Sequence, residues 1–233
     1  MRIRFQILLI CYCVSLHSRG QEPPNQAQLA IEQFRQGSGL VNTFDHRYEG
    51  VKGIPFFAED WLPGFLQLQE DYERTSGVKL HVDIYNQDVY VMPATGHSFF
   101  KLESLVHAIY LIQDDDTVKF IGVDADRIQQ ALHPHYYLQE MWKGAKLGFY
   151  RMPFKILHKA DYKGAYANGD RYDEFIPDEL WYIFDGEEFH KVKLNHKALT
   201  KTFPEMKGQF EKQKISTSAN FIDALKLMDK EFR

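Results

Sequence analysis

The stretch that decides the fold is VKLHVDIYNQDVYV, residues 78–91. The apolar residues at even positions from Val78 to Ile84 alternate with polar or mixed ones, which is the two-residue period of a strand with one buried and one wet face. Asn86-Gln87 then separates this run from a second apolar run that begins at Val89, a spacing typical of a hairpin. The stretch therefore predicts an antiparallel pair of strands.

Short apolar runs recur on both sides of this hairpin at intervals of about 8 to 12 residues. They lie at 66–68, 98–102, 106–112, 118–123, 181–184 and 189–194, and turns are predicted at 114–116, 143–144 and 185–186. This rhythm favours an antiparallel meander over a parallel sheet with crossover helices. We therefore expect an α+β fold whose β-rich domain, residues 43–194, is a meander that is closed or half closed into a barrel.

Helical spacing occurs at both ends of the chain. Ala27, Ile31 and Phe34 predict a short N-terminal helix over about 26–36, within a polar leader segment at 21–42. Residues 195–233 are predicted to form a helical tail packed on the sheet. Its expected helices begin near Asn195 and Pro204, and a last one, capped by Asn220 with Asp223, places Phe221, Leu225, Met228 and Phe232 on one stripe.

The first twenty residues have the pattern of a cleavable signal peptide. Arg2 and Arg4 give a positive start, Phe5–Leu16 is an apolar run, and Ser18 and Gly20 are small residues at the expected cleavage site. A membrane anchor is the alternative, but a bilayer span needs about 20 apolar residues and this run is shorter. We expect cleavage after Gly20 and a location in the periplasm, at the outer membrane or outside the cell, with no transmembrane segment in the mature chain.

Loss of residues 1–20 would remove Cys11 and Cys13, the two cysteines of the chain, together with three arginines. Of 28 Lys and Arg, 25 would remain against 32 Asp and Glu, a net charge of −7. The basic residues are scattered among acids, so we expect no nucleic-acid partner. Without cysteine, neither a disulfide framework nor a thiolate metal site is available to the mature chain.

One phrase of the sequence has a familiar order. FDHRYEGVKG at 44–53 leads through Pro55 to WLPG at 61–64, a meander follows, and Tyr172-Asp173 precedes a late strand. This layout, over about residues 43–230, resembles a group of uncharacterised exported β-rich proteins of Gram-negative bacteria. The resemblance implies the β-rich fold class and the exported location, and it implies no reaction and no catalytic residue.

The most metal-like spacing in the chain is His133-Pro134-His135. Two imidazoles two residues apart can share one ion if the fold supplies a third ligand, such as His46, His107 or an aspartate. The alternative is a plain surface turn, because Pro134 favours a turn and no HExxH pattern accompanies the pair. A metal-dependent hydrolase acting on envelope or external polymers is the functional hypothesis that this pair supports.

Other candidate chemistry is weaker. The acidic residues at 114–116 and at Asp124 and Asp126 have the oxygen ligands that calcium prefers, but they lack the glycine and distal glutamate of an EF-hand loop. Ser98 and Ser104 are not set in a GxSxG nucleophile motif. No catalytic residue and no cofactor is therefore predicted.

The chain is rich in aromatic residues, with 13 tyrosines and 3 tryptophans. Trp142, Tyr162, Tyr166 and Tyr172 are the predicted ligand-binding residues, because exposed rings there would let a sugar ring or a partner side chain stack. The alternative is that these rings only pack against the sheet edges and the terminal helices. The leading hypothesis is a non-enzymatic binding or structural component of the cell envelope, with an envelope protein or a glycan as its partner.

Overall fold

The computed structural model describes residues 48–70, 78–93, 99–102, 105–161, 172–204, 215 and 217–231. The predicted signal peptide at 1–20, the predicted N-terminal helix at 26–36, and Tyr162 and Tyr166 lie outside this part of the chain.

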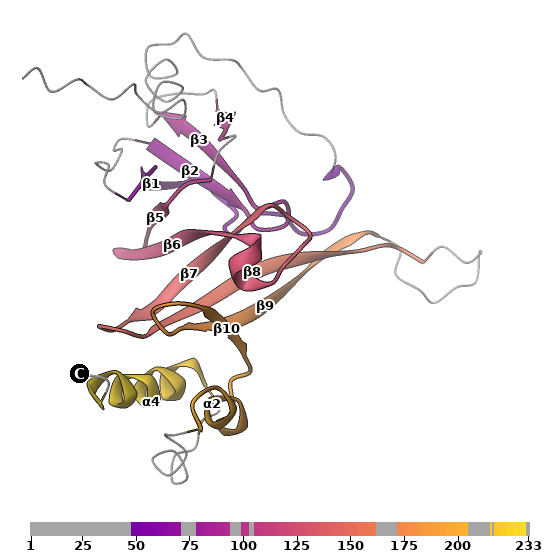
Figure 1. The fold of residues 1–233 in the computed structure, drawn as a ribbon. Coiled ribbons are helices and arrows are strands. Elements are labelled where there is room, and N and C mark those ends of the chain that lie inside the picture. The colour runs from indigo at the N-terminus through magenta and orange to yellow at the C-terminus, as the bar shows by residue number, and fades with distance from the viewer. Residues whose placement is uncertain are drawn as a thin grey trace, which may run out of the picture.

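The described residues form an antiparallel, β-rich α+β fold built on one ten-stranded sheet (Figure 1). The strands are β1 Leu62–Gln67, β2 Val78–Asp83, β3 Asp88–Pro93, β4 Phe100–Lys101, β5 Ala108–Gln113, β6 Asp116–Asp124, β7 His135–Lys143, β8 Gly148–His158, β9 Glu174–Phe184 and β10 Phe189–Val192. They are ordered β10-β9-β8-β7-β6-β5-β1-β2-β3-β4. Because β4 and β10 are the two edges of the sheet in the described part of the chain, the sheet is not closed, and the closed alternative of the predicted barrel is wrong.

The predicted hairpin is confirmed as β2 and β3, which pair from Val78↔Pro93 to Asp83↔Asp88. The predicted wet face of β2 is wrong at two positions, because His81 and Asp83 are both buried. The segment before β1 covers that face: Phe56 stacks on the His81 ring at 3.7 Å between centroids, and His81 Nε2 lies 2.9 Å from the Ala58 carbonyl oxygen. Short-range alternation does not reveal a face that a distant segment covers.

The acidic turn at 114–116 is a two-residue hairpin turn between β5 and β6. Gln113 pairs with Asp116, and the two residues between them have φ of 49° at Asp114 and 68° at Asp115. Positive φ at both central positions defines the turn whose twist matches that of paired strands, and aspartate tolerates this conformation.

The sheet departs from a simple meander at one connection. β5 lies beside β1, so the chain between β4 and β5 returns across the β1–β4 unit. Val106 in this return is fully buried, and its carbonyl oxygen lies so close to Gly122 on β6 that a Cβ at Gly122 would come within 2.0 Å of it. Glycine at 122 is therefore a requirement of the fold.

Among the described residues, two α-helices, α2 His196–Thr202 and α4 Ser218–Glu231, cover one face of the sheet near β10 (Figure 1). Asn195 caps α2 as predicted, since its side chain accepts a hydrogen bond from the Ala198 amide at 2.9 Å. For α4 the predicted cap is wrong: Asn220 lies inside the helix, and its backbone amide donates to the Thr217 hydroxyl at 3.3 Å. The predicted stripe is present in the described residues, because Phe221, Leu225 and Met228 are fully buried.

The last turn of α4 also holds the loop between β7 and β8. The carboxylate of Asp229 accepts hydrogen bonds from the backbone amides of Ala145 at 2.8 Å, Lys146 at 2.8 Å and Leu147 at 3.0 Å. Gly144 must remain without a side chain here, because a Cβ would come 2.5 Å from the Asp229 Cγ. This contact docks the helix to the sheet.

Candidate functional site

The candidate site forms where two neighbouring strands separate. β7 and β8 pair from Lys143↔Gly148 only as far as Gln139↔Arg151. Pro153 lies two residues further along β8, and a proline has no N–H with which to continue the ladder. β8 continues with β9 alone, as far as His158↔Glu174, and forms the two-stranded arm that extends from the sheet (Figure 1).

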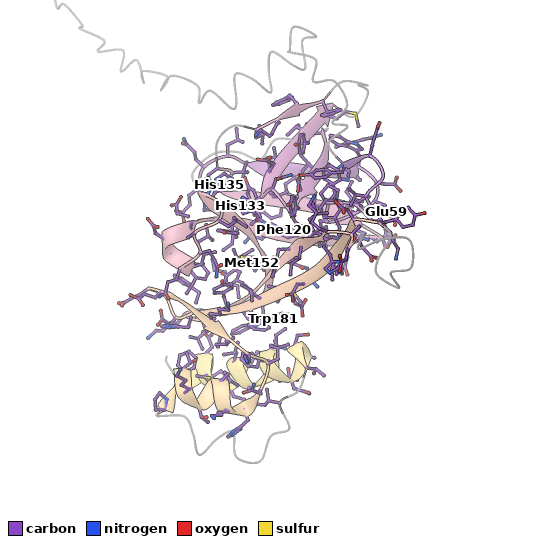
Figure 2. All side chains as sticks on the ribbon, turned by 90° about the vertical axis from the view of Figure 1, so that its right-hand side faces the viewer. Glu59, Phe120, His133, His135, Met152 and Trp181 are labelled. Atoms are coloured by element: carbon purple, nitrogen blue, oxygen red, sulfur yellow. The ribbon has the colours of Figure 1, made fainter. Side chains whose placement is uncertain are left out.

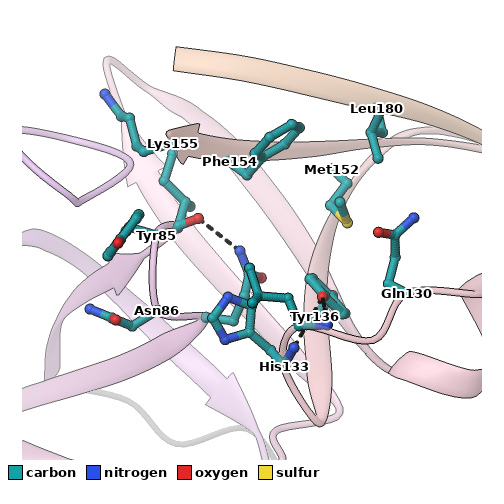
Figure 3. A pocket seen from close by; sticks show the side chains of 12 residues that line it. Tyr85, Asn86, Gln130, His133, Tyr136, Met152, Phe154, Lys155 and Leu180 are labelled. Atoms are coloured by element: carbon teal, nitrogen blue, oxygen red, sulfur yellow. Dashed lines mark hydrogen bonds between the residues drawn. The ribbon is translucent and has the colours of Figure 1, made fainter. Parts of the chain in front are cut away.

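The β2–β3 turn, residues 84–87, lies in the fork between β7 and β8 and encloses a cavity of about 250 Å³ (Figure 3). We call it the fork cavity. Its lining residues come from the turn, from the 130–136 segment and from the two strands of the arm: Ile84, Tyr85, Asn86, Gln87, Gln130, Leu132, His133, Tyr136, Met152, Phe154, Lys155 and Leu180. Most of this lining is apolar, with a few polar groups, as is usual in ligand sites.

Gln87 fixes the turn against β7. It is buried, and its φ of 60° lies in the left-handed region. Its side-chain nitrogen donates to the Ile84 carbonyl oxygen at 2.8 Å, and its side-chain oxygen accepts from the Tyr137 backbone amide at 3.0 Å. Asp83 shapes the same turn by accepting from the backbone amides of Tyr85 at 2.9 Å and Asn86 at 2.8 Å. The wall of the cavity is therefore set in place by hydrogen bonds before any ligand arrives.

The opposite wall is organised around Tyr136. Its hydroxyl oxygen accepts hydrogen bonds from the backbone amides of Leu132 at 3.2 Å and His133 at 3.1 Å. Gln130 donates to the Tyr182 hydroxyl at 3.0 Å. These contacts hold the 130–133 segment over Met152 and leave Leu132, at 84% exposure, at the rim.

His133 and His135, the predicted metal ligands, lie near each other at the start of β7 (Figure 2). Burial lowers the pKa of His133 below its ordinary value, although Asp88 opposes the shift, so the ring is neutral at pH 7. The described residues contain no group of three or more histidine, cysteine, aspartate or glutamate side chains able to hold a metal ion. The pair thus acquires no third ligand within the described residues, and the metal-dependent hydrolase stays a prediction.

The predicted aromatic surface is not assembled by the two members that the structure describes. Trp142, on β7, packs in the core beneath the helices. Tyr172, at 64% exposure, precedes β9 at the far end of the arm. Trp142 pairs with Phe149, and Phe149 pairs with Ile183 on β9. Ile183 lies about 30 Å along β9 from Glu174, the first residue of that strand. The two rings therefore lie at opposite ends of the β8–β9 ribbon.

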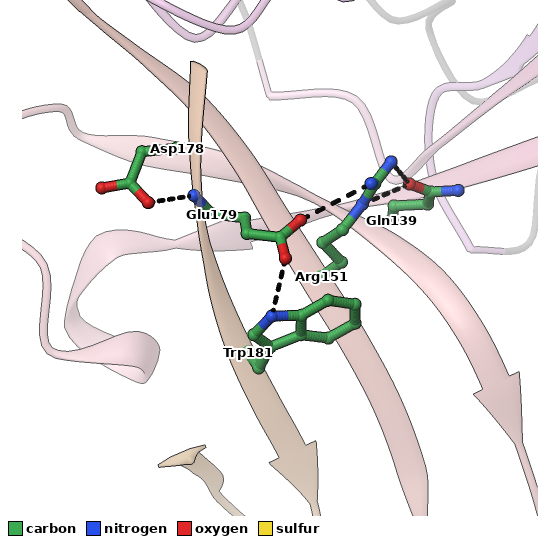
Figure 4. A network of polar contacts seen from close by, with 5 residues as sticks. All are labelled: Gln139, Arg151, Asp178, Glu179 and Trp181. Carbon is green, nitrogen blue, oxygen red and sulfur yellow. Dashed lines mark hydrogen bonds and ion pairs between the residues drawn. The ribbon is translucent and has the colours of Figure 1, made fainter. Parts of the chain in front are cut away.

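A second polar cluster lies on the sheet face that carries the helices (Figure 4). The Arg151 guanidinium donates to the Gln139 side-chain oxygen, with its Nε at 2.9 Å, and lies 3.6 Å from a Glu179 carboxylate oxygen. The other oxygen of Glu179 accepts from the Trp181 indole at 3.1 Å. These polar groups are hydrogen-bonded or ion-paired to one another across three strands. The network therefore mainly stabilises the contact between β7, β8 and β9.

Neither the fork cavity nor this network was predicted from the sequence. The signal available for the cavity is a proline inside an otherwise regular strand, Pro153, which predicts an interrupted ladder. The network depends on the register Gln139↔Arg151↔Trp181, which is a property of the folded sheet.

Comparison with protein-family models, with curated proteins and with solved structures finds no match to this chain. No helix in the described part of the chain is long and apolar enough to cross a membrane. The function has to be inferred from the geometry of the protein itself.

Proposed function

We propose that the protein is a non-enzymatic binding protein of the cell envelope, and that the fork cavity is its ligand site. The observation that supports this proposal is the cavity itself: about 250 Å³, mostly apolar, and walled by a turn that Gln87 ties to β7. A preformed apolar cavity with few polar groups binds a small ligand without the cost of ordering a loop. The pattern of residues 1–20 supports the exported location.

Native mass spectrometry of the protein purified from the envelope fraction of its own host tests both parts of the proposal. We expect the mass of residues 21–233 together with a non-covalent adduct. Recovery of the uncleaved chain from the cytoplasm alone would contradict the location.

A matched pair of variants connects the adduct to the cavity. Leu132→Trp places a large ring at the exposed rim of the cavity, where it is expected to obstruct entry without disturbing the core. Leu227→Trp makes the same change at a residue of α4 with 44% exposure that does not line the cavity. We expect the adduct to be lost from Leu132→Trp and retained by Leu227→Trp. Equal retention in both variants would show that the ligand binds elsewhere.

A further inference from the structure

We propose that the ligand of the fork cavity is an uncharged amphiphile with a single alkyl chain, whose hydroxyl end lies between Tyr136 and Gln130 and whose chain leaves the cavity along the β8–β9 arm. The inference rests on the proposed function and names the class of ligand. Three features support it: the lack of charge in the described lining, two hydrogen-bonding groups that the described residues leave unused, and an exposed apolar stripe on the arm.

The described lining offers no charge to a ligand. Lys155 alone among these lining residues is charged at neutral pH, because the burial that lowers the pKa of His133 keeps that ring neutral. Lys155 lies on the opposite face of β8 from Phe154, and its ammonium group points away from the cavity (Figure 3). It also lines the neighbouring groove, together with Asp178. A charged ligand in the fork cavity would therefore lose hydration without meeting a counter-charge.

Two hydrogen-bonding groups of the lining are unused. The Tyr136 hydroxyl oxygen accepts from two backbone amides, and no described residue accepts its proton. Gln130 donates to the Tyr182 hydroxyl, and no described residue donates to the Gln130 side-chain oxygen. Tyr136 also lies near Tyr182: burial raises the pKa of Tyr182, the hydrogen bond from Gln130 opposes this shift, and the charge of Tyr136 adds to it. A ligand hydroxyl can accept from Tyr136 and donate to Gln130, whereas a carboxylate can only accept.

An apolar stripe continues from the cavity wall onto the arm. Alternate residues of a strand share a face, so the cross-strand pairs Met152↔Leu180 and Ile156↔Ile176 lie on one face of the arm, with Phe154 between them. We call these five residues the arm stripe. Its first three members line the cavity, whereas Ile156 and Ile176 are exposed, at 47% and 42%. Contiguous exposed apolar side chains that adjoin a cavity are typical of a binding surface.

The register of the arm sets the direction of the chain. Tyr182, to which Gln130 donates, lies next to Leu180 on the same face of β9, so the unused polar groups adjoin the inner end of the arm stripe. Ile156 lies about 13 Å along β8 from Met152, at the outer end. A dry cavity of about 150 Å³ holds one benzene molecule, so the fork cavity, at about 250 Å³, holds only the first part of a long chain. The rest of the chain would cover the exposed end of the arm stripe.

Three ligands with the same eight-carbon chain test the charge: 1-octanol, octanoate and octylamine. They are titrated at pH 7 into the purified protein carrying ¹³C-labelled methionine methyl groups, and the methyl resonance of Met152, in the cavity wall, reports binding. We expect 1-octanol to bind about tenfold or more tightly than either charged ligand, because only the charged ligands lose ionic hydration without compensation.

1-Butanol and 1-octanol test the path of the chain, because 1-butanol is small enough to remain inside the cavity. Complete burial of one methylene strengthens binding about fourfold, so 1-octanol should bind about tenfold or more tightly than 1-butanol even if its tail is only partly covered. Ile156→Thr keeps a β-branched residue on the strand and removes apolar area from the outer end of the arm stripe. It should weaken 1-octanol binding about threefold and leave 1-butanol binding unchanged.

Ile112→Thr is the matched control, since Ile112 lies on β5 with 41% exposure and does not line the cavity. It should change neither affinity. If Ile156→Thr and Ile112→Thr affect 1-octanol equally, the path of the chain along the arm is overturned.

The outcomes separate this inference from the proposed function. If octanoate or octylamine binds as tightly as 1-octanol, the ligand class is wrong while the cavity remains a binding site. If none of the ligands moves the Met152 resonance at millimolar concentration, both proposals fail. 1-Monooctanoylglycerol distinguishes two sources of the same chemistry: tighter binding than 1-octanol indicates a neutral glycerolipid, and equal or weaker binding indicates a free alcohol.

Discussion

Asp229→Ala tests how the C-terminal helix is held to the sheet. The carboxylate of Asp229 accepts three backbone hydrogen bonds from residues 145–147, and the residue is only 5% exposed. Among the three donors, Leu147 is buried, whereas Ala145 and Lys146 are exposed. Water can therefore replace the carboxylate at two of the amides, but not at Leu147.

The expected loss follows from this difference. A buried donor left without an acceptor costs about 1–3 kcal/mol, and each exchange of an exposed hydrogen bond for water costs about 0.5 kcal/mol. Asp229→Ala should thus lower the free energy of unfolding by about 2–4 kcal/mol, measured by urea denaturation at constant m-value. Asp229→Asn keeps one acceptor oxygen and should lose about half as much. Hydrogen exchange at the Leu147 amide should accelerate in both variants.

Asp223→Ala is the matched control, because Asp223 lies on the same helix with 71% side-chain exposure and a single pairing, to Lys226 at 3.3 Å. A pair of this kind contributes about 0.3–0.5 kcal/mol. If Asp229→Ala destabilises the protein no more than Asp223→Ala, the carboxylate is not what docks α4 and the reasoning is refuted.

Three further predictions follow from the same contacts. Gly144→Ala should lower the free energy of unfolding as much as Asp229→Ala does, because its Cβ would come 2.5 Å from the Asp229 Cγ. By urea denaturation, the double variant should lose far less free energy of unfolding than the sum of the two single losses. Gln87→Ala should lower the free energy of unfolding by about 2 kcal/mol, because it removes two hydrogen bonds. Gln87→Gly should lower it by about 1 kcal/mol less, because glycine tolerates the φ of 60°. Equal urea midpoints for these two variants would contradict the left-handed conformation at residue 87. Burial lowers the pKa of His81 from 6.5, so His81 takes up a proton less readily in the folded protein than in the unfolded chain. The contribution of His81 to the free energy of unfolding should therefore be fully present above pH 6.5 and should decrease as the pH falls through that value. His81→Gln should flatten this pH dependence of the urea midpoint.

Much of the fold could be predicted from short stretches of sequence. The alternation at 78–84, the aspartates at 114–115 and the helical stripe from Phe221 to Met228 each predict one element correctly, because a strand, a tight turn and an amphipathic helix are governed by residues within a few positions of one another. Asn195 as a helix cap belongs to the same group. The residue that caps α4 is Thr217 and not the predicted Asn220, an error of three positions within one turn.

The candidate site was almost wholly out of reach of the sequence. His133 was singled out for metal binding and proves to line the fork cavity, while neither Trp142 nor Tyr172, the described members of the predicted ligand-binding set, lines it. The cavity exists because β7 and β8 stop pairing after Gln139↔Arg151, before Pro153, and because the β2–β3 turn fills the fork. Pro153 is a sequence signal for the interruption, but the turn that fills the fork is visible only in the folded sheet.

Local order was thus determined by the sequence itself: where strands, turns and helices begin, and which positions of each are apolar. Tertiary structure alone decided which elements meet. β5 returns to β1, a covering segment buries His81 and Asp83, Gln87 reaches Tyr137 across 50 residues, and Asp229 reaches Ala145 across 84. The physical reason is that propensity and periodicity act over a few residues, whereas burial and hydrogen-bond satisfaction are settled only when distant segments exclude water from one another.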